Sequence, residues 1–121
     1  MQLIWIALGG AAGAVCRALA SHWIPTEFPW ATLLVNVVGS FIIGLVFGLE
    51  PYLHLSPHVR VLLTAGFCGA LTTFSTFSYQ TLALFEKGDI AAAAANIALN
   101  LILTLVAVWS AIKLAAVVGR A

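Results

Sequence analysis

Charged residues are scarce in this sequence. Only 7% of its 121 residues are charged, whereas a typical soluble domain carries about 25%. A water-soluble surface needs those charges, so the composition excludes an ordinary soluble domain. Five basic side chains against four acidic ones leave a net charge of +1, which does not provide the concentrated positive surface that nucleic-acid binding requires.

Cysteine is also rare, and the N-terminal segment has no basic region. Cys16 and Cys68 both fall in apolar segments, so we expect no disulfide framework. The residues after Met1 are neutral, and the first apolar run is longer than the ~7–15 residues of a signal-peptide core. We therefore expect this run to be retained as a membrane span.

What the chain does contain is long apolar segments, and hydrophobic residues make up 63% of it. A helix crosses a bilayer with about 20 apolar residues, so a chain of this length holds four spans and no extramembrane domain. We expect the spans at residues 3–19, 30–49, 59–85 and 90–118. The sequence thus predicts an all-α integral membrane protein, with residues 1–121 forming a single four-helix transmembrane domain.

The third segment differs from a plain span. Gly66 and Gly69 are followed by a hydroxyl-rich stretch at residues 72–78, close to the expected middle of the bilayer. Glycine weakens a helix, and hydroxyl groups compete for backbone hydrogen bonds. We therefore expect a break in the third helix. Non-helical backbone at that depth is tolerated only inside protein or along a polar path.

Polar side chains recur at regular spacing within the spans. They are Thr32, Asn36 and Ser40 in the second span, Asn96, Asn100 and Thr104 in the fourth, and Thr72, Thr73, Ser75, Thr76 and Ser78 in the third. A four-residue spacing places side chains on one helical face. A lone Ser or Thr usually bonds to its own helix, but an asparagine has four hydrogen-bonding sites to satisfy. Three asparagines on two stripes favour a polar track across the membrane, with bonds between helices as the alternative.

The chemistry of this track favours an anion. No acidic residue lies well inside a span, although carboxylates usually line cation and proton paths. The available groups are neutral donors: hydroxyls, amide and backbone N–H groups, and the positive edges of phenyl rings. Such groups can replace part of the water around a small anion without trapping it. Arg17 either concentrates anions at an entrance or simply extends toward the headgroups.

Neither an enzyme nor a fixed orientation is indicated. His22, His54 and His58 lie near span ends without an evident nucleophile or carboxylate partner. Basic residues divide three to two between the two sides of the membrane, too small a difference to set topology. Insertion in both orientations is therefore plausible and permits an antiparallel homodimer.

Three motifs carry a resemblance to a known family. They are Gly10-x-x-Gly13-x-x-x-Arg17 in the first span, Thr32-Leu33-x-Val35-Asn36-x-x-Gly39 in the second, and the run from Gly66 to Ser78 in the third. The glycine patterns are weak alone, whereas the T-T-F-S-T-F run in a four-span chain is specific. Over essentially its full length the chain resembles the Fluc (CrcB) fluoride channels.

The resemblance implies a function and a set of residues. It implies an antiparallel, dual-topology homodimer in the plasma membrane, with two pores that passively export fluoride left behind when HF enters and dissociates. The pore residues it implies are Asn36, Phe74 and Phe77, with Thr76, Thr32, Asn96, Asn100 and Thr104 continuing the track and Arg17 near the vestibule. It also implies a structural Na⁺ at the dimer centre, held by backbone carbonyls of Gly69 and Thr72 from both subunits.

Three positions depart from the family pattern, and two other functions remain as alternatives. Ala31 replaces a usual glycine, Ala18 a common aromatic residue, and Gln80 a frequent glutamate. A small multidrug transporter has a similar size and topology, but its class resembles a proton-coupled antiporter with a glutamate in the first span, and residues 3–19 contain none. A non-transporting scaffold would be favoured if the polar stripes merely bonded to one another.

Overall fold

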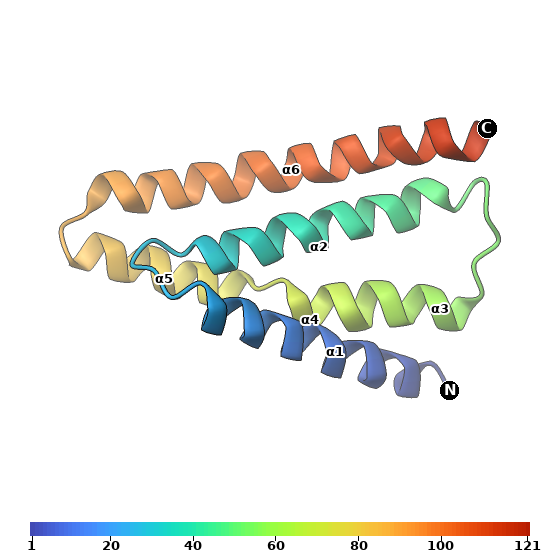
Figure 1. The fold of residues 1–121 in the computed structure, drawn as a ribbon, viewed down its shortest axis with the longest axis horizontal. Helices are drawn as coiled ribbons and strands as arrows, with labels where there is room; N and C mark the ends of the chain where they lie inside the picture. The colour runs from blue at the N-terminus through green and yellow to red at the C-terminus, as the bar shows by residue number, and fades with distance from the viewer.

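The computed structural model describes all 121 residues and consists of helices joined by short connections (Figure 1). The elements are α1 (Gln2–Trp23), α2 (Trp30–Leu49), α3 (Pro57–Val61), the π-helical stretch η1 (Leu62–Cys68), α4 (Gly69–Leu71), α5 (Phe74–Glu86) and α6 (Ile90–Arg120). Four segments are long and apolar enough to cross a membrane, namely α1, α2, Pro57–Glu86 and α6. The prediction of an all-α chain with four spans is confirmed, although α1 and α6 extend beyond the expected ends.

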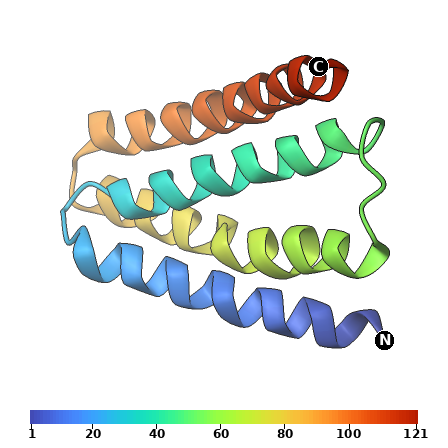
Figure 2. The same ribbon diagram turned by 45° about the vertical axis from the view of Figure 1, so that its right-hand side comes forward.

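The four spans alternate in direction, so both termini lie at the same end of the bundle (Figure 1). The helix α2 packs chiefly against α6, and α1 packs chiefly against η1 and α4. In both views α2 lies between α6 and the third segment, which in turn lies beside α1 (Figure 2). Within the subunit the third segment therefore packs against α1 and α2, and its α5 part also packs against α6.

Capping side chains set where helices begin. The Ser56 hydroxyl accepts a hydrogen bond from the Val59 N–H (3.3 Å), and the Asp89 carboxylate accepts one from the Ala92 N–H (3.1 Å). Both satisfy backbone donors that have no partner inside the first helical turn. Gly88 adopts a left-handed φ of 83°, which only glycine enters without strain. This tight turn lets α6 return antiparallel to α5.

The helix α1 contacts η1 backbone to backbone. A Cβ atom on Gly9 would collide with the carbonyl oxygen of Leu62, and one on Gly13 with that of Phe67. Small residues allow such close approach where the hydrophobic effect cannot drive association. The π-helical stretch has a wider turn than an α-helix and often occurs near functional sites. Its presence was not expected from the sequence, which indicated only a weakened helix.

Most of the molecular surface is apolar. Only 22 of the 121 residues are buried, and large hydrophobic side chains are exposed along every span. A monomeric soluble protein rarely exposes apolar patches of this extent. This surface is suited to contact with lipid or with another subunit, in agreement with the membrane assignment.

The contact between α1 and η1 predicts different outcomes for two neighbouring glycines. We expect Gly9→Ala to destabilise the fold by about 1–3 kcal/mol, because the new methyl group meets fixed backbone atoms. Gly10→Ala is the matched control, since its Cβ would meet nothing closer than the Gly66 carbonyl at 3.9 Å. Thermal unfolding of both purified variants in detergent measures the difference. Equal stability of the two variants would contradict the described contact.

Candidate functional site

The third span is interrupted between α4 and α5. Thr72 (φ −81°, ψ 152°) and Thr73 (φ −150°, ψ 117°) are both extended. The Thr73 hydroxyl accepts a hydrogen bond from the Thr76 N–H (3.1 Å) and so caps α5. The expected helix break is confirmed, and it lies at the first two threonines of the hydroxyl-rich stretch, whereas Gly66 and Gly69 remain within helical turns.

An asparagine of α2 stabilises this break. The Thr73 N–H donates to the Asn36 Oδ1 at 2.8 Å, whereas in a continuous α-helix it would donate to the carbonyl of Gly69. A buried backbone N–H without a partner is costly, so the side chain replaces a helical bond. As a consequence, the Gly69 carbonyl loses its usual helical partner, at a residue that is exposed.

The helix α2 lies unusually close to the break. A Cβ atom on Gly39 would collide with the Thr72 methyl group, so glycine makes room for the extended threonine. The Thr72 hydroxyl turns back to donate to the Cys68 carbonyl at 2.8 Å. This packing brings the break against the polar stripe of α2.

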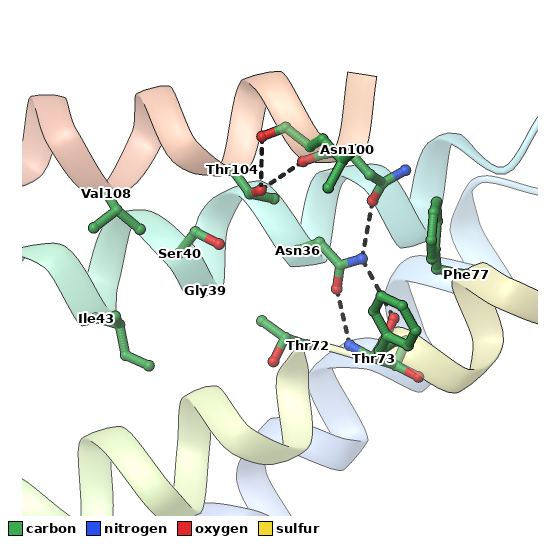
Figure 3. Close-up of a pocket in the computed structure, with 12 residues that line it drawn as sticks. Asn36, Gly39, Ser40, Ile43, Thr72, Thr73, Phe77, Asn100, Thr104 and Val108 are labelled. Atoms are coloured by element: carbon green, nitrogen blue, oxygen red, sulfur yellow. Dashed lines mark hydrogen bonds between the residues drawn. The ribbon is translucent and has the colours of Figure 1, made fainter. Parts of the chain in front are cut away.

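A hollow of about 280 Å³ opens beside the break (Figure 3). Side chains from α2, α5 and α6 and from the break itself line it. The lining residues are Asn36, Gly39, Ser40, Ile43, Thr72, Thr73, Phe74, Phe77, Asn100, Leu101, Thr104 and Val108. Part of each polar stripe, Asn36 and Ser40 of α2 and Asn100 and Thr104 of α6, therefore lines one cavity.

The asparagines of the two stripes bond to each other across the helices. Asn36 Nδ2 donates to Asn100 Oδ1 at 3.0 Å and, more weakly, to the Thr73 carbonyl at 3.4 Å (Figure 3). Asn100 Nδ2 donates to the Oδ1 (3.0 Å) and backbone carbonyl (2.9 Å) of Asn96. Asn96 Nδ2 in turn donates to the Thr81 hydroxyl at 2.8 Å. These buried amides thus have partners within the subunit while two of them also face the hollow.

Two phenyl rings stand at the hollow, both from the first turn of α5. The centroids of Phe74 and Phe77 are 5.5 Å apart, with their planes inclined by 54°. Phe74 is 77% exposed in the isolated subunit. The edge of a phenyl ring carries partial positive charge, so ring edges directed at the hollow would attract an anion.

The hollow is electrically neutral. None of its lining residues carries a charge. Arg17, the basic residue of the predicted path, is half-buried on α1 and does not line the hollow. The ion pair of the subunit, Arg60 with Glu50 at 2.9 Å, joins α3 to the C-terminal end of α2, and neither residue lines the hollow. No carboxylate therefore repels an anion from the lining itself.

The structure divides the predicted site residues into two groups. Lining the hollow are Asn36, Phe74, Phe77, Asn100 and Thr104, together with Thr72 of the predicted sodium site. Outside it are Thr32 (3% exposed), Asn96 (0%), Thr76, Arg17 and Gly69. Thr76 accepts a hydrogen bond from the Thr73 hydroxyl (3.0 Å) and lies next to the lining.

Three functional positions were not chosen from the sequence. Ser40 lines the hollow, and its place four residues after Asn36 on the same stripe was the available signal. Thr73 was recognised only as part of the hydroxyl run, although its backbone N–H anchors Asn36. Thr81 had no signal, because its contact with Asn96 depends on how α5 packs against α6.

Comparison with known proteins identifies the family. Residues 4–112 match the family described as CrcB-like protein, Camphor Resistance (CrcB). A protein of Shewanella sp. (strain ANA-3) named fluoride-specific ion channel FluC is 48% identical over 112 residues, which cover 89% of this chain and 90% of that protein. The proteins of the same name from Shewanella oneidensis and Shewanella amazonensis are 48% and 46% identical with the same coverage. The match covers most of the chain, which has four spans with a break in the third, and the chain therefore belongs to the CrcB family.

Proposed function

We propose that this protein is a fluoride channel of the plasma membrane and that it works passively, without catalysing a reaction. The observation that carries the proposal is the hollow beside the helix break, which is lined by neutral donors, phenyl rings and three aliphatic side chains and by no charged side chain. Relatives with nearly half of their residues identical are named fluoride-specific channels. Export of fluoride down its gradient would confer resistance to the ion.

The hollow offers donors that an anion can use. The Asn36 amide nitrogen donates one N–H to Asn100 Oδ1, with the nitrogen 3.0 Å from that oxygen. Its second N–H points to the Thr73 carbonyl oxygen, which lies 3.4 Å from the same nitrogen. Such a long bond is weak, so this N–H loses little when an ion replaces the Thr73 carbonyl as its acceptor. The Ser40 hydroxyl lines the hollow and has no partner among the side-chain hydrogen bonds of the subunit. These groups, with the ring edges of Phe74 and Phe77, would replace part of the water of a fluoride ion.

The other residues of the predicted track lie beside the hollow, at an entrance or behind the lining. Thr104 lines the hollow on α6, and Thr76 continues the hydroxyl groups along α5. Arg17, half-buried on α1 and without an ion pair, would raise the local fluoride concentration at an entrance. Thr32 and Asn96 are buried within the subunit and would act behind the lining.

A second subunit would complete the pore. Phe74, Ser75 and Ser78 are exposed next to non-helical backbone in the middle of the third span. Lipid cannot satisfy polar groups at that depth. An antiparallel homodimer would cover this surface with protein, and the nearly even division of basic residues between the two ends permits both orientations. Two copies of the hollow then give two pores.

A structural Na⁺ fits the backbone at the break. The Gly69 carbonyl loses its helical partner because the Thr73 N–H donates to Asn36. Carbonyl oxygens are suitable ligands for a hard cation, and Gly69 is exposed where a second subunit would pack. The carbonyls of Gly69 and Thr72 from both subunits would hold the ion and join the two breaks.

The channel is tested by flux from liposomes. We expect purified protein to release fluoride rapidly from loaded vesicles, followed with a fluoride electrode, while chloride is retained. The release should need no proton gradient, because no acidic or histidine side chain lines the hollow. Absence of fluoride release, or equal chloride release, would contradict the proposal.

The pore lining is tested in the same assay with two phenylalanine variants of α5. We expect Phe77→Leu to reduce the initial fluoride rate by about tenfold or more, because an aliphatic side chain has no positive edge to face the ion. Phe85→Leu is the matched control: Phe85 lies on the same helix, is 57% exposed and does not line the hollow. Equal rates for the two variants would show that the ring of Phe77 does not contact the ion.

Sodium binding is tested by thermal stability of the purified protein. At equal ionic strength we expect Na⁺ to raise the unfolding temperature relative to K⁺, with a dependence on Na⁺ concentration, because a ligand bound only to the folded state stabilises it. Unfolding curves that coincide in the two salts would contradict the proposed ion.

A membrane scaffold is the second candidate function. The observation that favours it is the pair of side-chain bonds that link α6 to α2 (Asn36 to Asn100) and to α5 (Asn96 to Thr81), which would join helices without any transport. The hollow beside these amides and the weakly held Asn36 N–H favour the channel. The liposome assay decides between them, since a scaffold releases neither ion.

A further inference from the structure

All three asparagines of the chain belong to one hydrogen-bonded relay. We use the name for five consecutive bonds, which run from the Thr73 N–H through the side chains of Asn36, Asn100, Asn96 and Thr81 to the Phe77 carbonyl. Their donor–acceptor distances are 2.8, 3.0, 3.0, 2.8 and 2.7 Å in that order. The relay begins at the helix break and ends in the first turn of α5.

Backbone groups fix the direction of the relay at both ends. The Thr73 N–H can only donate, so the oxygen of Asn36 must face it. The Phe77 carbonyl can only accept, so the Thr81 hydroxyl must donate to it and must accept from Asn96. Between these ends each amide must point its oxygen toward the preceding donor. No single amide can rotate by 180° without placing two donors or two acceptors face to face.

We infer that Asn96 and Thr81 are positioning residues for conduction. Neither lines the hollow: Asn96 is wholly buried, and Thr81 lies behind Phe77 on α5. They hold the two groups that do line it, the Asn36 amide at one end of the relay and the turn that carries the Phe77 ring at the other. This inference rests on the proposed channel function and assigns these two residues a role in that function.

The burial of Asn96 supports this role over simple packing. An amide at 0% exposure is costly unless its donors and acceptor are paired, and here both groups of the amide are bonded to the relay. An apolar residue would fill the same space between α5 and α6 without that requirement. The amide, unlike an apolar side chain, fixes the orientation of its neighbours, because Asn100 must donate to its oxygen and Thr81 must accept from its N–H.

Thr81→Val is the decisive variant. It keeps the shape of the side chain but removes the hydroxyl, which leaves the Asn96 amide without its acceptor and the Phe77 carbonyl with only its helical backbone donor. Thr81→Ser restores the hydroxyl. Thr64→Val is the matched control, because Thr64 makes the same bond to the carbonyl four residues earlier, that of Arg60 (2.8 Å), and no asparagine donates to it.

Fluoride flux from liposomes gives the functional result. We expect Thr81→Val to lower the initial fluoride rate about tenfold per assembled protein, because a buried donor without a partner reorients or draws in water. Thr81→Ser and Thr64→Val should keep rates close to that of the unmodified protein. If Thr81 only filled space, the valine variant, which has the same shape, would keep the fluoride rate of the unmodified protein. Loss of rate with valine and recovery with serine therefore assign the effect to the hydroxyl.

Side-chain amide NMR gives a result that does not depend on transport. Protein labelled with ¹⁵N-asparagine shows only three side-chain amide pairs, and all three are members of the relay. We expect the hydrogens of all three amides to exchange slowly with solvent in the unmodified protein. This measurement does not depend on the folding of any variant. In Thr81→Val the resonances of Asn96 and also of Asn36, at the far end, should shift, whereas Thr64→Val should leave them in place.

The outcomes separate this inference from the proposed function. Rapid exchange of any of the three pairs in the unmodified protein, or an unchanged Asn36 resonance in Thr81→Val, would overturn the relay. Full fluoride flux through Thr81→Val would overturn the positioning role while the channel stands. Failure of the unmodified protein to release fluoride would overturn the channel itself, and the exchange measurement would still decide whether the relay exists.

Discussion

One hydrogen bond organises the centre of this protein: the bond from the Thr73 N–H to the Asn36 side chain. A helix that crosses a membrane must satisfy every backbone group internally, and an interruption in its middle is allowed only if other protein groups take over. Asn36 supplies the missing acceptor from a neighbouring helix. The extended backbone of Thr72 and Thr73 depends on it, and so does the loss of a helical partner at the Gly69 carbonyl.

The same asparagine connects structure to transport. One end of its amide is committed to the break and the other to Asn100, so the side chain has little freedom. Asn36 lines the hollow, and its second N–H is held only weakly, with the amide nitrogen 3.4 Å from the Thr73 carbonyl oxygen. A donor that is fixed in position but makes only a weak hydrogen bond suits conduction, because the pore must bind an ion readily and then release it. The neutral lining serves the same end, since a full positive charge would hold fluoride too tightly.

Close helix packing makes this arrangement possible. Gly9 and Gly13 allow η1 to contact α1 through its backbone, and Gly39 allows Thr72 to approach α2. In a membrane these contacts cannot come from the hydrophobic effect, because lipid is as apolar as the side chains. Shape and hydrogen bonds must therefore position the third span. The glycines allow the helices to approach closely because they have no side chain, and the asparagines fix how the helices are oriented through directional hydrogen bonds.

The sequence by itself determined the membrane class, the four spans, the presence of a helix break and the neutral chemistry of the polar stripes. Hydropathy and a four-residue spacing are local properties, so they can be read directly from the chain. Only the tertiary structure decided that the break falls at Thr72 and Thr73, that Asn96 lies behind the lining and that Thr81 completes the relay. These features depend on which helix faces each amide and how closely it approaches, and spacing along one helix contains no information about the distance to the next.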